Sequence, residues 1–305
     1  MYTRNSILDE FKGAFNKPNN SHVQLIIINV VVFVVLGLLR VVADLGGAGE
    51  VFLFIDRQFM IPPTGGEFIT RPWTMITYMF NHAGLMHILF NMLWFYFFGR
   101  LIIEYLGNEK LISIFIVGGL AGAVAYLFMY NVVPYYIDRS GGPGMVGASG
   151  AINAVIVAAA TLLPNYAVNL LFFGSVRIKY IALFFIAWSL LNITGNNSGG
   201  NIAHLGGAGI GYLYIKSLNS GTDIGRWVIV VMNFFKSFFV SQPKMTVNYS
   251  SKKKKSAKTT SATKTTATNI SDQKEIDAIL DKISQSGYES LSKEEKQKLF
   301  NASKN

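Results

Sequence analysis

Six apolar segments, each close in length to the thickness of a lipid bilayer, restrict the folds open to this chain more than any other feature. A helix crosses the hydrocarbon region with roughly 20 residues, and only helices and closed barrels satisfy every backbone hydrogen bond there. The segments cover residues 23–42, 86–105, 111–133, 148–163, 178–193 and 202–218. Hydrophobic residues make up 51% of the 305-residue chain and charged residues 14%, which is too apolar for a water-soluble domain of this length. We therefore predict an all-α fold, a polytopic membrane bundle of six transmembrane helices with a small helical C-terminal appendage.

The bundle, predicted to cover residues 23–218, is flanked by segments of other composition. Residues 1–22 are polar and mixed in charge, and no small-residue cleavage site follows the first apolar segment. We therefore expect a cytoplasmic N-terminal segment followed by a retained membrane helix. Residues 219–241 contain a short apolar run interrupted by Lys236, which favours an interfacial helix over a further span. The long connection between the first two spans is also apolar, and we expect it to lie in the interface.

The C-terminal part of the chain divides into two segments. Residues 242–271 are rich in Lys, Ser and Thr and have too few apolar residues to form a core, so we predict a disordered linker. Residues 272–305 predict a small helical hairpin, because apolar residues recur at helical spacing before Gly287 and Ser292 forms a capping box with Glu295. The sequence assigns no function to this hairpin.

The distribution of lysine and arginine predicts the orientation of the bundle. If the N-terminus is cytoplasmic, the inner side carries Arg4, Lys12, Lys17, Arg100, Lys110, Arg177, Lys179 and Lys216. The opposite side then carries only Arg40, Arg57, Arg71 and Arg139. The positive-inside rule therefore places both termini in the cytoplasm, and we expect a multi-pass protein of a bacterial inner membrane. The net charge of +10 comes largely from the C-terminal lysines, which favours contact with membrane lipids and not with nucleic acid.

Polar side chains inside the predicted spans are few, and each is a functional hypothesis because it is costly to place in a membrane. Three of the four histidines fall at or just inside the ends of spans, and His22 flanks the first span. The second, fourth and sixth spans run in the same direction, so His87, Asn91, Ser149 and His204 share one depth. Separate hydrogen bonds to neighbouring helices are the alternative explanation, and for Ser149 alone they are the better one.

Small residues favour the functional explanation. The fourth span carries Gly147, Gly150, Ala151, Ala154 and Ala158, and the sixth carries Ala203, Gly207 and Gly211. Helices with such faces approach each other closely, which would bring Ser149 and His204 within hydrogen-bonding distance. The close crossing could also serve stability alone.

A serine next to a histidine predicts acyl transfer, in which His204 takes the proton of Ser149 and returns it to the leaving amine. No Asp or Glu lies at matching depth, and Glu104 is at the opposite end of its helix, so we predict a dyad in place of a triad. His87 and Asn91, one helical turn apart, would stabilise the oxyanion together with the backbone N–H of Ser149. His82 is interpreted as a structural residue of the loop entering the second span. The chain has no cysteine, which excludes a thiolate nucleophile and Cys-ligated zinc, and we expect no metal and no cofactor.

At these residues the sequence resembles the rhomboid family of intramembrane serine proteases. The resemblance rests on the motifs Gly147-Ala148-Ser149-Gly150, His87-Ile88-Leu89-Phe90-Asn91 and Ala203-His204 followed by Gly207 and Gly211. It covers residues 52–218 and implies a six-helix bundle, a water-filled cavity open to the outside and lateral entry of a substrate helix. It also implies Ser149 as nucleophile, His204 as base, and His87, Asn91 and the Ser149 N–H as the oxyanion site. One departure is Asn153, where some members carry an aromatic residue that stacks on the catalytic histidine.

Two other functions stay open beside an intramembrane protease. A catalytically inactive relative would bind membrane helices without cutting them, and a six-span transporter would show broken helices at the midplane or charged rings along a pore, neither of which is evident. Other intramembrane proteases are disfavoured because the chain has no His-Glu-x-x-His motif and no pair of intramembrane aspartates. The expected partners are transmembrane protein substrates. The sequence specifies neither the substrate nor the oligomeric state.

Overall fold

The computed structural model describes residues 13, 19–170, 174–239, 276–284 and 287–302. The chain divides into two compact units, Met1–Gln242 and Pro243–Asn305. The predicted N-terminal segment, residues 1–22, lies almost entirely outside the described residues, and the predicted linker, residues 242–271, lies entirely outside them.

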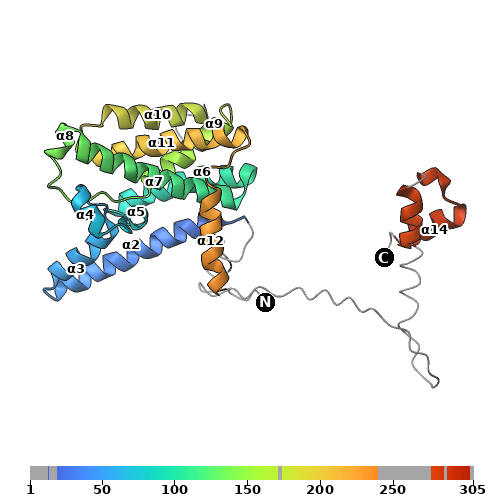
Figure 1. Cartoon of the computed structure of the whole chain (residues 1–305), viewed down its shortest axis with the longest axis horizontal. Coiled ribbons are helices and arrows are strands. Elements are labelled where there is room, and N and C mark those ends of the chain that lie inside the picture. Colours follow the sequence, from blue (N-terminus) through green and yellow to red (C-terminus); the bar gives the residue numbers. More distant parts are fainter. Residues whose placement is uncertain (1–12, 14–18, 171–173, 240–275, 285–286, 303–305) are drawn as a thin grey trace, which may run out of the picture. The chain divides into compact units, whose positions relative to one another are not determined.

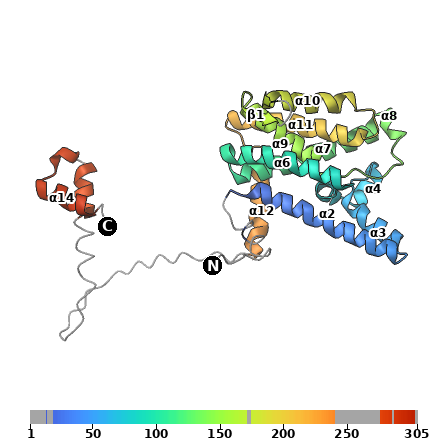
Figure 2. The same ribbon diagram turned by 180° about the vertical axis from the view of Figure 1, so that it is seen from behind.

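The first unit is a bundle of helices (Figures 1 and 2). Its principal helices are α2 (Ser21–Leu45), α6 (Leu85–Leu106), α7 (Asn108–Val132), α9 (Ser149–Leu162), α10 (Ile178–Leu191) and α11 (Ser198–Asn219). Each overlaps one of the six apolar segments, so the predicted helical fold class is confirmed. Within the described ranges, α2, α6 and α7 are each long and apolar enough to cross a membrane, whereas α9 and α10 are apolar but shorter. The count of six spans stays a prediction.

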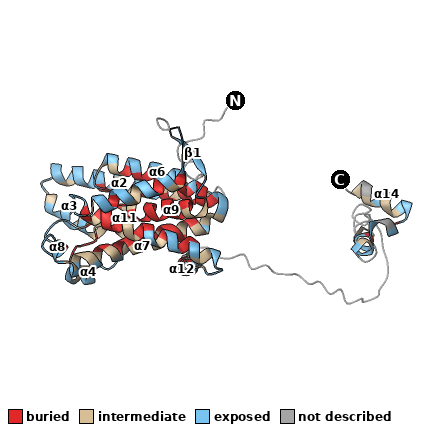
Figure 3. Ribbon diagram, turned by 90° about the horizontal axis from the view of Figure 1, so that it is seen from above, coloured by how far each residue is buried: buried red, intermediate tan, exposed pale blue. Residues whose placement is uncertain are grey.

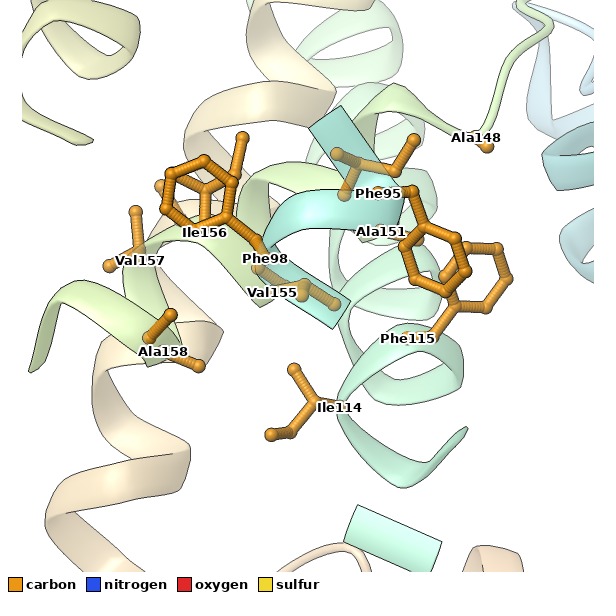
Figure 4. Close-up of a cluster of buried hydrophobic side chains, with 14 of the residues drawn as sticks. Phe95, Phe98, Ile114, Phe115, Ala148, Ala151, Val155, Ile156, Val157 and Ala158 are labelled. Atoms are coloured by element: carbon orange, nitrogen blue, oxygen red, sulfur yellow. The ribbon is translucent and has the colours of Figure 1, made fainter. Parts of the chain in front are cut away.

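Helix α9 forms the centre of the bundle. It packs against α6, α7, α10 and α11, and all of residues 150–160 are buried, which gives the red centre of Figure 3. Five of these residues are alanine and one is glycine, so the neighbouring helices can approach closely. The side chains that fill the remaining space come from those neighbours, as with Phe95 and Phe98 of α6 and Ile114 and Phe115 of α7 (Figure 4).

Short helices form the connection between α2 and α6, which the sequence predicts to lie in the interface. They are α3 (Gly49–Asp56), η1 (Arg57–Phe59), α4 (Gly65–Thr70), α5 (Thr74–Thr77) and η2 (Tyr78–Phe80). Thr64 caps α4 by accepting a hydrogen bond from the Glu67 N–H at 3.4 Å. The connection is joined to the segment before α9 by paired backbone hydrogen bonds between Ile61 and Met145.

A β-hairpin follows α9, and the sequence analysis did not predict it. Strand β1 (Ala167–Leu170) pairs antiparallel with β2 (Gly174–Arg177), with Ala167 opposite Arg177. Strand β2 ends directly where α10 begins. It lies at the end of the bundle where α6 ends and α7 begins (Figure 2).

Two further helices lie at opposite ends of the bundle. Helix α8 (Pro134–Ile137) follows α7, and Pro134 supplies its first residue, where a missing N–H costs nothing. Helix α12 (Arg226–Phe239) follows α11 and runs across the bundle helices (Figures 1 and 2). Its position overlaps the helix predicted within residues 219–241.

The second unit contains helical residues 276–284, η3 (Tyr288–Ser290) and α14 (Lys293–Ala302). The capping box is confirmed, because the Ser292 N–H donates to Glu295 Oε2 at 2.7 Å and the Glu295 N–H donates to Ser292 Oγ at 3.3 Å. Lys282 pairs with Glu295 at 2.9 Å and joins the two helical segments. Gly287 between them has a positive φ of 76°, which glycine adopts without strain.

Candidate active site

The structure brings Ser149 and His204 together. Ser149 is the first residue of α9 and His204 lies in the second turn of α11, and Ser149 Oγ is 2.7 Å from His204 Nε2. Both residues are only partly buried. This is the geometry that a histidine needs to accept a proton from a serine hydroxyl.

Glycines allow the contact between α9 and α11 on which this pair depends. A side chain at Gly207 would overlap the carbonyl oxygen of Gly150, and one at Gly211 would overlap that of Ala154. A methyl group at Gly122 of α7 would lie 2.9 Å from the Ala203 carbonyl oxygen of α11. The close approach predicted from the small residues is therefore confirmed, and it involves three helices.

The segment before α9 holds Ser149 at the helix N-terminus. Gly147 has φ of 123°, a conformation that residues with a side chain rarely adopt, and its N–H donates to the Tyr78 carbonyl at 2.9 Å. The Ile61–Met145 bridge fixes the preceding residues. The turn therefore fixes the position at which α9 starts, and with it the Ser149 side chain.

His204 has a second partner that the sequence analysis missed. Ser189 Oγ of α10 lies 3.1 Å from His204 Nδ1, and Ser189 is almost fully buried. The signal was an isolated serine in the apolar segment 178–193, and the rule applied to the other intramembrane polar residues would have found it. In the described residues, both ring nitrogens of His204 thus have a serine hydroxyl within hydrogen-bonding distance.

His87 and Asn91, the two predicted oxyanion residues, both belong to α6. The Ala83 N–H donates to His87 Nδ1 at 3.4 Å, which assigns the ring proton to Nε2. A methyl group at Gly147 would lie 2.9 Å from His87 Nε2 and 3.7 Å from Ser149 Oγ, so this nitrogen faces the region next to the serine. The Asn91 amide nitrogen is buried and has no hydrogen-bond partner in the part of the chain that is described.

Two other polar residues surround the site. His82 is buried in the loop before α6, and its ring meets that of His87 edge-on with centroids 5.1 Å apart. Neither of its ring nitrogens has a hydrogen-bond partner among the described residues, and its structural role stays a prediction. Asn153 occupies the position at which some members of the resembled family carry an aromatic residue. It is buried, and its side-chain amide donates to the Ser149 carbonyl at 2.9 Å.

A cavity of about 710 Å³ reaches His87 from the end of the bundle near α8. Its wall includes Tyr126 and Tyr130 of α7, Arg139, the loop 142–146 and residues 194–200, which include the first residues of α11. Two tyrosine hydroxyls make hydrogen bonds within this wall: Tyr130 lies 2.8 Å from Ser198 Oγ, and Tyr135 donates to the Thr194 carbonyl. Tyr136, the next residue along the chain, donates to the Ile193 carbonyl. The cavity is large enough for several residues of a peptide.

The fold and the site define a class: a helical integral membrane protein with a serine and a histidine joined across two helices. Residues 70–220 match the family model described as Rhomboid domain. Rhomboid-like protein 12, mitochondrial, of Arabidopsis thaliana is 34% identical over 200 residues, which are 62% of this chain and 59% of the relative. Rhomboid protease GlpG of Salmonella choleraesuis is 34% identical over 84 residues, which are 28% of this chain and 26% of the relative. The chain belongs to the rhomboid family.

The C-terminal residues match a different model. Residues 263–305 match one described as Family of unknown function (DUF6576), and this match contains the helices of the second unit. The Arabidopsis and Salmonella relatives are each matched over less than two thirds of their own length.

Proposed function

We propose that the chain is an intramembrane serine protease that hydrolyses peptide bonds of transmembrane proteins with a Ser149–His204 dyad. The observation that carries the proposal is the 2.7 Å contact between Ser149 Oγ and His204 Nε2 at the start of a buried helix. Membership of the rhomboid family, with GlpG proteases among the similar sequences, supports the same reaction class.

In the proposed reaction Ser149 Oγ attacks the scissile carbonyl carbon while His204 Nε2 takes the hydroxyl proton. The carbon–nitrogen bond then breaks and the same proton passes to the leaving amine. Water attacks the resulting ester, His204 takes a proton from that water, and the proton returns to Ser149 Oγ as the acid leaves. The steps balance without any group other than substrate and water.

The oxyanion formed in each step requires hydrogen-bond donors, and α6 offers two. With its Nδ1 accepting from Ala83, His87 has its proton on Nε2, next to Ser149. Asn91 has a buried amide nitrogen with no partner among the described residues. The N–H of Ser149, at the N-terminus of α9, is a third donor. Such donors stabilise the transition state because negative charge develops at the carbonyl oxygen.

Ser189 acts in this proposal as a positioning residue for His204. His204 can accept from Ser149 only if Nε2 has a free lone pair, so the ring proton must be on Nδ1. That proton then points at Ser189 Oγ, 3.1 Å away, which accepts it. The hydroxyl selects the tautomer and ring orientation that an aspartate selects in soluble triads.

The charges of the bundle support the proposed orientation. Within 19–239, the end where α6 meets α7 carries seven basic residues and three acids, a net charge of +4, and the other end carries four basic residues and five acids, a net charge of −1. The positive-inside rule makes the first end cytoplasmic, so the cavity beside α8 opens outward. A bacterial inner membrane is part of this proposal, and membrane fractionation of the source cells tests it.

A fluorophosphonate probe tests the nucleophile without a known substrate, because it reacts covalently with activated serine hydroxyls. The full chain in liposomes should be labelled at Ser149, and Ser149→Ala and His204→Ala should each abolish labelling. Ser220→Ala, which removes an exposed serine at the end of α11, is the matched control and should label normally. Wild type that stays unlabelled, or labelling that survives Ser149→Ala, would contradict the proposal and favour an inactive relative that binds membrane helices.

The same variants identify substrates. Comparison of membrane-protein ectodomains released from cells with wild type, Ser149→Ala or Ser220→Ala should show fragments that depend on Ser149 alone. Cleavage sites mapped on those fragments should fall within or next to a transmembrane segment.

A further inference from the structure

We propose that α12 is a membrane-surface anchor whose exposed apolar face inserts into the anionic leaflet at the basic end of the bundle. The inference concerns a part of the chain outside the Ser149–His204 site, and its test requires no proteolysis. It rests on the faces of α12, on the contacts that fix its direction and on the charge around it.

The exposed apolar side chains of α12 lie on one face. At 100° per residue, one sector of about 140° contains Trp227, Val230, Val231, Phe234, Phe235 and Phe238. Each of these side chains is between 44% and 68% exposed in the structure. Six large apolar side chains in one sector form a surface that lipid covers and water does not.

A second face of α12 attaches the helix to the bundle. Val228 is 4% exposed and packs where α12 meets α7. Just before the helix, Ser113 Oγ of α7 donates to the Gly225 carbonyl at 3.1 Å. A side chain at Gly225 would meet the Tyr214 ring 2.5 Å away, so α11 and α12 approach closely at this turn.

Asp223 fixes the turn before α12. It forms an ion pair with Lys110 of α7, accepts from the Tyr214 hydroxyl of α11 at 3.1 Å and accepts from the Gly225 N–H at 3.1 Å. Three helices are thereby joined at one carboxylate, which we call the Asp223 junction. The junction holds α12 across the bundle helices (Figures 1 and 2). If the bundle helices cross the membrane, α12 therefore lies parallel to the membrane plane.

The polar residues of α12 indicate the kind of lipid. They are Arg226, Asn233, Lys236 and Ser237, and they share one sector of about 100° between the apolar face and the face that contacts the bundle. The described part of α12 contains no acidic residue. The net charge of the described residues at this end of the bundle is +4. Cations beside a helix in the membrane plane attract anionic headgroups. The described part of α12 has 14 residues, fewer than the roughly 20 of a span, and Lys236 lies within it.

Spin labels test the proposal because the chain has no cysteine of its own. Phe234→Cys on the apolar face and Asn233→Cys on the polar face would each be labelled in the full chain, reconstituted into phosphatidylglycerol-containing vesicles. Leu183→Cys on the exposed face of α10 is a reference for hydrocarbon depth, and Ser220→Cys is a reference for water. The measurement is the collision rate of each label with oxygen, which concentrates in lipid, and with a water-soluble nickel complex.

We expect the label at 234 to have a high oxygen-to-nickel collision ratio, close to that of the hydrocarbon reference at 183. The label at 233 should have a low ratio, close to that of the water reference at 220. The ratio at 234 should fall when Arg226 and Lys236 are both changed to Gln, and this loss should occur in phosphatidylglycerol vesicles but not in pure phosphatidylcholine.

Several results would overturn the proposal. Frequent collisions with nickel for the labels at both 233 and 234 would place α12 in water. An oxygen-to-nickel ratio typical of hydrocarbon at both positions would make α12 a membrane span. If the label at 234 collides with neither oxygen nor nickel, and its spectrum shows spin–spin broadening that disappears on dilution with unlabelled chain, a second copy of the chain covers the apolar face of α12. If the double Gln variant lowers the ratio at 234 equally in both lipids, α12 does not recognise anionic headgroups.

Discussion

At His204, a neutral hydroxyl occupies the position where soluble serine hydrolases use a carboxylate. Ser189 can accept a hydrogen bond from Nδ1 at 3.1 Å, but it brings no negative charge to stabilise the imidazolium. In a poorly solvated bundle an unpaired buried carboxylate would be costly, and a serine avoids that cost. The orientation of the histidine therefore depends on one weak acceptor and on packing.

Ser189→Ala should reduce the rate of fluorophosphonate labelling by about 3- to 10-fold, the equivalent of one ordinary hydrogen bond. The loss of an acceptor also disfavours the protonated imidazole, so the acidic limb of the rate-against-pH profile should move to lower pH. The pH profile of labelling measures both effects. Ser189→Thr keeps the hydroxyl and should restore the wild-type profile. A pH limb that does not move in Ser189→Ala would show that Ser189 is structural only.

At the scale of elements, the site depends on how closely α9 and α11 approach. A side chain at Gly207 would overlap backbone atoms of α9, which cannot move aside as a flexible side chain can. Gly209, two residues further along α11, has nothing within 4 Å of the position that a Cβ would take. The same helix therefore supplies a test residue and a matched control.

Gly207→Val should separate α9 from α11 and lower the free energy of unfolding by about 1–3 kcal/mol or more, as overpacking does. Since an error of about 1 Å in reacting groups costs about 100-fold, labelling of Ser149 should fall by a similar factor. Gly209→Ala should label as wild type with an equal or higher Tm, because alanine favours a helix more than glycine does. Thermal unfolding and labelling rates measure the two effects, and normal labelling in Gly207→Val would contradict this account.

The sequence predicts helices and small-residue faces well because both depend on local periodicity. The six apolar segments, the capping box at Ser292 and the contact of Ser149 with His204 were all accessible to that reasoning. The β-hairpin at 167–177 was not, because its two paired strands have four residues each and are too short for a clear alternation of apolar and polar residues. The cost of a polar residue in a span marks Ser189 as a candidate, but its partner depends on the rotation of α10 toward α11, which a single serine in an apolar segment does not specify.

For the first unit as a whole, the Asp223 junction joins α7, α11 and α12 at the basic end of the bundle. Partial burial tends to raise the pKa of Asp223, but the hydrogen bonds from Lys110, Tyr214 and the Gly225 N–H outweigh it and hold the pKa below its ordinary value of 3.8. A carboxylate with a lowered pKa in the folded state stabilises that state at every pH above its ordinary value. The stabilisation decreases as the pH falls below 3.8. It is lost once the pH falls below the pKa that Asp223 has in the folded protein.

Asp223→Asn should therefore lower the free energy of unfolding at pH 7 by about 2 kcal/mol, the range of a hydrogen-bonded charged group, and leave Lys110 without its partner. The difference between wild type and variant should shrink as the pH falls below the ordinary pKa of aspartate. Unfolding in detergent across that range measures it, with Asp138→Asn at the other end of the bundle as the control. Release of α12 should also weaken the contrast between spin labels at 233 and 234. A pH-independent difference would mean that Asp223 contributes shape and not charge, and that α12 is held by packing around Val228 and Gly225.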